Sequence, residues 1–220
     1  MLDRGAMPPL AKRMPYAPFV PLRIFSSFTM LDGAIDPKAI AKLAKARGYP
    51  AIAICDRNGL YGSVAFAPAC RDAGVQPIIG TFLAVARPEE TGGQDRAIDW
   101  LALYARNDAG WLNLCHLVSK AHLDRPLELE PHVLLSDLEG QTEGLIALSG
   151  AGEGALARLL AEGRGEAAAD YCARLEALFP DRLYIEIARR GDPVEDASED
   201  ALIDLAYARG LPLVASKPAL

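Results

Sequence analysis

The 220-residue sequence predicts an α/β fold in which a largely parallel sheet closes as a barrel. Apolar runs of strand length alternate with amphipathic runs of helix length along most of the chain. About seven strands separated by helices imply right-handed βαβ units, in which successive strands are parallel. The hydrophobic content of 51% is enough for a sizeable core, either in one domain or in a small pair.

The first part of the chain supplies three expected strands and two expected helices. Residues 19–25 and 51–55 are short apolar runs typical of buried strands. Between them, residues 36–48 begin with Asp-Pro and end with cations and a glycine, which are start and stop signals of a helix. Residues 64–73 predict a second helix with an internal proline as a candidate kink, and residues 77–86 predict a third strand.

The middle of the chain continues the alternation with two interruptions. The polar residues 87–96 predict a loop, after which residues 100–105 predict a strand and residues 110–121 a helix. Residues 123–140 show no clear period and are expected to form an irregular connection over the surface. Residues 144–149 are the next expected strand.

The last third of the chain returns to regular alternation. Residues 153–161 and 166–179 predict two helices, and residues 183–187 (L-Y-I-E-I) predict a strand. A final helix over residues 199–209 leads into a last strand at residues 212–215.

Charge and composition limit the classes of function. The net charge of −6 argues against tight DNA binding by this chain alone, because such binding depends on Lys and Arg that displace counterions. No apolar run approaches the roughly 20 residues of a membrane span. Residues 1–18 are proline-rich and predict a flexible extension rather than a secretory signal. Four scattered cysteines without a C-x-x-C pair favour reduced thiols in a cytosolic protein: Cys55, Cys70, Cys115 and Cys172.

The expected mouth of the barrel is poor in catalytic groups. Barrel chemistry lies at the carboxyl ends of the strands, where only Asp56 and Glu186 are plausible metal ligands. A hydrolytic metal site needs several histidines or carboxylates at one point. Asp56 could equally cap a helix or pair with an arginine. Ser26 and Ser27 stand at another strand end, but no histidine lies at a matching position to act as their base.

Two further groups are weaker candidates for a cation site. His116 and His122 are six residues apart, a spacing that places them on different faces of a helix and favours surface or capping roles. The acidic residues 192–200 could bind a cation, although a solvated surface loop is the simpler interpretation.

Five sequence blocks carry a family resemblance when they are taken in order. They are F-V-P-L-R-I-F-S-S-F-T-M-L-D-G, A-I-C-D-R-N-G-L-Y-G, G-V-Q-P-I-I-G-T-F, L-Y-A-R-N-D-A-G-W-L-N-L and G-L-I-A-L-S-G. Together they resemble the polymerase-and-histidinol-phosphatase (PHP) domain, in the version at the N-terminus of bacterial DNA polymerase III alpha subunits. The resemblance implies a distorted (βα)7 barrel over residues 19–220, as the first part of a much longer polymerase chain.

The resemblance also implies a metal site that has lost its ligands. Members with an intact site carry H-x-H-x-H-S in the first block, D-H-G in the second and a glutamate after I-I-G-x in the third. Beside Asp56, the aligned ligand positions of this chain are Pro21, Arg23, Phe25, Arg57, Phe82, Trp100 and Ala151. The apolar side chains would fill the former pocket. Either arginine could pair with Asp56, but an arginine cannot be a metal ligand because it offers only donors.

Two hypotheses of function follow from the resemblance. The first is a structural, non-catalytic PHP domain of a cytoplasmic replicative polymerase, which binds no cofactor of its own. Its implied partners are the rest of the polymerase chain and, in some bacteria, the proofreading exonuclease subunit, while the full polymerase contacts DNA. The alternative is a stand-alone metal-dependent phosphoesterase of the same superfamily, which would need the missing ligands. A related alpha-type polymerase for lesion bypass is compatible with the same blocks.

Overall fold

The computed structural model describes residues 16–88, 97–126 and 128–217. Most of the predicted extension and residues 89–96 of the predicted loop lie outside these ranges. The strands are β1 (Ala51–Arg57), β2 (Gln76–Ala86), β3 (Ile98–Ala105), β4 (Val133–Leu134), β5 (Leu145–Leu148), β6 (Leu183–Ile187) and β7 (Leu213–Ala215). The α-helices are α1 (Pro37–Ala46), α2 (Ser63–Ala73), α3 (Asp108–Leu123), α4 (Ala155–Ala161), α5 (Gly165–Leu178) and α6 (Pro193–Arg209). Two short 3₁₀ helices are Leu135–Leu138 and Ala151–Glu153.

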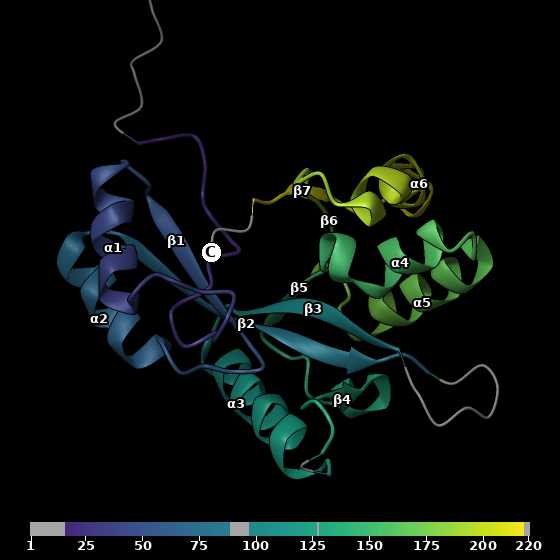
Figure 1. The fold of residues 1–220 in the computed structure, drawn as a ribbon, viewed down its shortest axis with the longest axis horizontal. Helices are drawn as coiled ribbons and strands as arrows, with labels where there is room; N and C mark the ends of the chain where they lie inside the picture. The colour runs from purple at the N-terminus through teal and green to yellow at the C-terminus, as the bar shows by residue number, and fades with distance from the viewer. Residues whose placement is uncertain (1–15, 89–96, 127, 218–220) are drawn as a thin grey trace, which may run out of the picture.

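A curled sheet forms the centre of the molecule, with strand order β1-β2-β3-β5-β6-β7 and with β4 paired to β2. Helices α1 and α2 lie at the β1 end of this sheet, and α4, α5 and α6 lie toward the β6–β7 end (Figure 1). Among the described residues, β1 and β7 remain the two ends of the sheet. The described residues therefore form a curled half-barrel, and the closed (βα)7 barrel is not confirmed.

The expectation of a largely parallel sheet is wrong at its centre. β1 and β2 are parallel, as are β5, β6 and β7, but β3 runs antiparallel to both β2 and β5. The physical reason lies in the connection between β2 and β3. A parallel neighbour needs a crossover connection of a dozen or more residues, whereas only residues 87–97 separate β2 from β3. The predicted loop between these two strands was the signal for the antiparallel pairing.

The expected first strand is present only as an irregular segment along β1. Pro21 and Ile24 accept backbone hydrogen bonds from Ala53 and Cys55, each 2.9 Å long. Pro21 has no backbone N–H, so it cannot continue a ladder as a donor. The segment nevertheless brings the Arg23 and Phe25 side chains to the inside of the half-barrel.

Most helices follow their sequence signals, and one begins earlier than predicted. Asp36 caps α1 by accepting from the backbone N–H of Lys38, and Pro37 is the first helical residue. α6 begins at Pro193 rather than Glu199, with Asp192 as its cap. The predicted acidic loop at residues 192–200 is therefore the start of a helix, where carboxylates interact favourably with the helix dipole. The predicted irregular connection contains β4 and a 3₁₀ helix.

The alternation of side chains along the strands separates an outer core from an inner one. Ile52 and Ile54 of β1 pack in the cluster that includes α1 and α2 residues, whereas Ala53 and Cys55 face the inner cluster that contains Phe82. Leu83 of β2 belongs to the large outer core. Within the described part of the chain, every helix is too short or too polar to cross a membrane.

Candidate functional site

Three aromatic side chains from different elements converge inside the half-barrel. The ring centroids of Phe25 and Phe82 are 6.0 Å apart, and those of Phe82 and Trp100 are 5.1 Å apart at an interplanar angle of 23°. Phe25 and Phe82 are buried, and Trp100 is half-buried. The convergence expected from the sequence is therefore present. Offset stacks of this kind are favourable beyond the area that they bury.

Two guanidinium groups cover these rings. The Cζ atom of Arg23 lies 3.6 Å from the ring centroid of Phe82, and Cζ of Arg57 lies 4.4 Å from that of Trp100. Arg57 is also 5.1 Å from the Phe82 ring centroid. A guanidinium over an aromatic face is attracted by the ring quadrupole, more strongly where water is excluded. We call Phe25, Phe82, Trp100, Arg23 and Arg57 the aromatic–arginine cluster.

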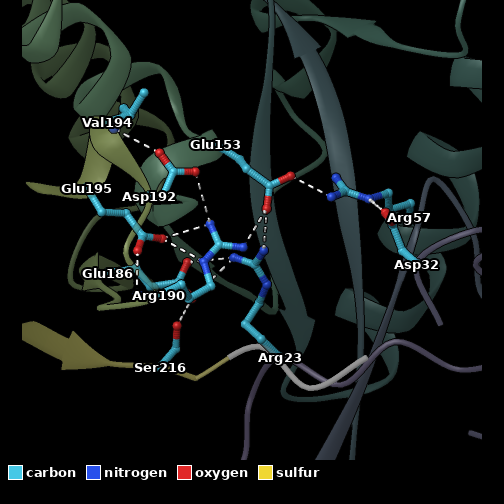
Figure 2. A network of polar contacts seen from close by, with 10 residues as sticks. All are labelled: Arg23, Asp32, Arg57, Glu153, Glu186, Arg190, Asp192, Val194, Glu195 and Ser216. Carbon is cyan, nitrogen blue, oxygen red and sulfur yellow. Dashed lines mark hydrogen bonds and ion pairs between the residues drawn. The ribbon is translucent and has the colours of Figure 1, made fainter. Parts of the chain in front are cut away.

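Carboxylates also bind both arginines (Figure 2). Nη1 of Arg23 donates to both oxygens of Glu186, at 3.0 and 3.2 Å, and neither side chain is more than 1% exposed. Arg57 donates from Nε to Asp32 at 2.7 Å and from Nη2 to Glu153. The second oxygen of Glu153 lies 3.5 Å from Nη2 of Arg23. Glu153 therefore links the two arginines.

The network extends to the start of α6. Arg190 lies 3.5 Å from Glu153 and donates from Nε to Glu195 at 2.8 Å. Ser216, just after β7, donates its hydroxyl to Glu186. These contacts join the irregular first segment, the β5–α4 connection and the ends of β6 and β7 in one polar cluster.

Several members of this network were not predicted from the sequence. Asp32 lies within the quoted T-M-L-D-G block, and Glu153 follows the L-S-G block by three residues. The sequence did show an acidic residue in each of two loops that follow strands, which was the available indication of carboxylate partners for the arginines. Their pairing depends on the curvature of the sheet, which places loops distant in sequence next to one another.

The expected pairing of Asp56 with an arginine is wrong. Its carboxylate accepts from the backbone N–H of Ser26 at 2.7 Å, from the Ser26 hydroxyl at 2.8 Å and from the Thr29 hydroxyl at 2.8 Å. Arg57 is the next residue in the strand, so its side chain points to the other face and reaches Asp32 instead. Asp56 thus fixes the loop that follows the first segment.

The other predicted positions have structural roles in the described contacts. Pro21 supplies a carbonyl to β1, and Ala151 begins a 3₁₀ helix with a positive φ of 48°. Ser26 is a partner of Asp56 rather than an isolated nucleophile. Nε2 of His122, an exposed side chain on α3, lies 2.8 Å from the carbonyl oxygen of Asn58, the residue after β1.

Burial and charge shift the ionisation of groups around the cluster. Desolvation opposes the charge of Arg23 and is the largest single effect, but the negative groups around it, Glu186 foremost, together outweigh it and raise the pKa of the guanidinium. Burial raises the pKa of the Cys55 thiol to about 12, and it also raises the pKa of the Tyr104 hydroxyl. At neutral pH the inside of the half-barrel therefore holds charged arginines beside neutral thiol and phenol groups.

The donor set of this site does not suit a metal ion. Phenylalanine and tryptophan side chains offer no lone pair for coordination, and guanidinium groups only donate. The carboxylates that point into the site already accept from arginines. Within residues 16–88, 97–126 and 128–217, no three His, Cys, Asp or Glu side chains gather as a metal ion would require.

Curated relatives match nearly the whole chain. The chain is 38% identical over 202 residues to the DNA polymerase III subunit alpha of Caulobacter vibrioides, and 37% identical over 198 residues to that of Escherichia coli. Each match covers 90% of this chain and 17% of the relative. An error-prone DNA polymerase of Symbiobacterium thermophilum is 36% identical over 211 residues. The chain thus spans about a sixth of the length of its relatives.

Solved structures of low sequence identity share the fold. One is described as a metal-dependent phosphoesterase from Bifidobacterium adolescentis, with a TM-score of 0.57, 15% identity and coverage of 92% of this chain and 88% of that one. An amidohydrolase from Chromobacterium violaceum gives a TM-score of 0.58 at 16% identity, covering 90% and 86% of the two chains. The family model described as the PHP domain matches residues 21–190. By this match, together with the fold, the chain belongs to the PHP domain family.

Proposed function

We propose that the chain acts as the PHP domain of a DNA polymerase III alpha-type polymerase, as a structural and subunit-contact module rather than a phosphoesterase. The relatives that match 90% of the chain are alpha subunits of this polymerase. The aromatic–arginine cluster is the observation that carries the proposed loss of activity. It occupies the positions where the resemblance places metal ligands.

The chemistry of the cluster supports a structural role. Hydrolysis of a phosphoester at neutral pH commonly relies on a metal-bound hydroxide as the nucleophile. The side chains of the cluster do not suit the metal ions of the superfamily as ligands. We therefore propose no metal-dependent hydrolytic step at this site. Asp56 is the remaining carboxylate of the aligned set, and three donors already hold it. A carboxylate so engaged is poorly placed to activate water.

The arginines provide fixed positive charge in place of bound cations. Arg23 joins the irregular first segment to Glu186 of β6, and Arg57 joins β1 to Glu153 beyond β5. A buried ion pair contributes little net stability, but removing one partner leaves an uncompensated buried charge. The network therefore acts as a set of mutually dependent links across the open half-barrel.

The partners and the cellular location are also part of the proposal. The partners would be the remainder of a polymerase chain and a proofreading exonuclease subunit, in the cytoplasm. The alternative of a stand-alone phosphoesterase has the support of the fold alone, because the neighbouring phosphoesterase structure is only 15% identical.

The proposal is tested by assays of the purified chain with added Mn²⁺ or Zn²⁺. We expect background release from phosphomonoesters and from the 3′ ends of DNA, equal in the parent and in Asp56→Ala. Metal-dependent release that disappears in Asp56→Ala would show an active site and overturn the proposal. Release that persists unchanged in the variant would instead come from a contaminating enzyme.

A further inference from the structure

A loop of the half-barrel exposes three large apolar side chains within four residues. Phe28, Met30 and Leu31 are 51%, 84% and 105% exposed. They lie in the connection between the irregular first segment and α1, next to the end of β1. Single exposed apolar residues are common, but neighbouring ones mark a surface that a partner covers. We call these three residues the apolar loop.

The apolar loop is rigidly held from below. Buried Asp56 accepts from Ser26 and from Thr29, on either side of Phe28. The backbone N–H of Gly33 donates to the carbonyl of Thr29 at 2.8 Å, which closes the turn. A Cβ atom at residue 33 would lie 1.9 Å from the Ser26 carbonyl oxygen, so only glycine fits this closure. The backbone that carries the apolar side chains is therefore held in one conformation.

Leu31 is the third residue of the turn in which the Thr29 carbonyl accepts from the N–H groups of Asp32 and Gly33, a place that calls for a left-handed backbone. Its φ is 74°, a left-handed conformation that is costly for a leucine. Asparagine or glycine would adopt this conformation more easily and would also suit an exposed turn. Strain at a fully exposed leucine suggests that its side chain is needed outside the described fold.

We infer that the apolar loop is the surface on which later parts of a longer polymerase chain pack. The inference rests on the proposed function, and it names the occupant of one surface. The matched relatives are about six times longer than this chain, so a large amount of protein is available in the same polypeptide. Permanent interfaces resemble a divided core and are more apolar than transient ones. A rigid, uncharged triplet of Phe, Met and Leu fits that permanent type.

The test compares matched variants in the full polymerase chain and in the 220-residue chain. Leu31→Asn removes the apolar side chain but tolerates the left-handed backbone, and Met30→Gln keeps the side-chain length. Tyr207→Gln, at a 75% exposed position on α6, is the control. We expect both loop variants to leave the melting temperature of the 220-residue chain unchanged or higher. In the full chain they should lower it by about 3 °C or more, while the control changes neither.

A photo-crosslinking amino acid at position 31 of the full polymerase identifies the occupant. We expect crosslinks to residues of the same polypeptide outside the PHP domain, and none from position 207. Crosslinks to a second copy or to a separate subunit would overturn the inference, as would loop variants that are as stable as the parent in the full chain. None of these results depends on phosphoesterase activity, which is the separate test of the proposed function.

Discussion

Replacing Phe82 with glutamate tests whether the aromatic–arginine cluster is a packed structural unit. Glutamate is the residue that the family resemblance places at this position. The Phe82 side chain is fully buried, stacked on Trp100 and covered by Arg23 at 3.6 Å. We expect Phe82→Glu to destabilise the fold and Phe82→Leu to do so much less.

The expected loss of stability combines two costs, the lost aromatic ring and the desolvated carboxylate, with one gain, the attraction of the new carboxylate to Arg23. Loss of a buried aromatic ring costs about 3–5 kcal/mol when it is truncated to alanine, and the methylenes of glutamate recover part of this at about 0.8 kcal/mol each. Desolvation of the new carboxylate adds a further cost. Attraction to Arg23 opposes it, but Arg23 would have to share its charge with fully buried Glu186.

The number of charges already present decides which effect is larger. Three guanidinium groups of the network, those of Arg23, Arg57 and Arg190, already face five carboxylates (Figure 2). A sixth carboxylate therefore has no free cation nearby. We expect a net loss of about 3–5 kcal/mol for Phe82→Glu, against about 1–2 kcal/mol for Phe82→Leu, which loses mainly the aromatic contacts.

The assay is urea unfolding of the parent and both variants in metal-free buffer. Midpoints are compared at constant slope, because a changed slope would report a changed unfolded or native state. If the glutamate variant is as stable as the leucine variant, the pocket is open to water and the packed cluster is wrong. If Mn²⁺ or Zn²⁺ restores the glutamate variant, a latent metal site survives, contrary to the present assignment.

Four further outcomes are expected. Arg23→Met should cost about 3–5 kcal/mol, and most of this loss should be recovered when Glu186→Leu is added to the same chain. If the losses of the two single variants simply add up in the double variant, the pair is not coupled. Asp56→Ala should cost about 1–3 kcal/mol by leaving buried donors unpaired, and an unchanged urea midpoint would contradict its role in holding the loop. Elemental analysis after dialysis should show no stoichiometric zinc, manganese or iron, and a chelator should leave the melting temperature unchanged; two equivalents of metal would overturn the assignment. Burial raises the pKa of Cys55 from 9.0 to about 12, so the neutral thiol stabilises the folded state fully below pH 9. This stabilisation is lost as the pH rises toward 12, by about 1.4 kcal/mol at pH 10. If a Cys55→Ala variant loses stability with the same alkaline slope, Cys55 is not the cause of that slope.

Much of the fold was predictable because local signals agree with the tertiary structure. Asp36 and Pro37 define the start of α1 in the sequence and in the structure alike. The antiparallel orientation of β3 was missed, although the predicted loop before it carried the information. The early start of α6 was missed because its acidic first turns resemble a solvated loop in composition, while Asp192 and Pro193 form a good helix start.

The site was predictable where the family motifs could be aligned and not where it depends on curvature. Phe25, Phe82 and Trp100 were assigned to the pocket from the aligned motif positions, and they meet because each lies at an inward position of a neighbouring segment. The partners of the arginines could not be assigned in this way. Asp32 and Glu153 come from separate loops, and only the curl of the sheet brings them to Arg57.

The proposed replacement of metal ligands by arginines has a physical rationale in the way that each kind of cation holds carboxylates. A bound cation holds its carboxylates only when the ligands are deprotonated and the metal is present, so its contribution changes with pH and metal supply. A guanidinium remains charged throughout the ordinary pH range and is covalently part of the chain. Its planar donors reach two carboxylates at once, as Arg57 does with Asp32 and Glu153. Aromatic rings then supply the volume and the electrostatic surface that such a cation prefers. Under the proposed function, the cluster provides the mechanical links of a metal site in a form that needs no metal, and it would hold no metal to activate the water on which hydrolysis depends.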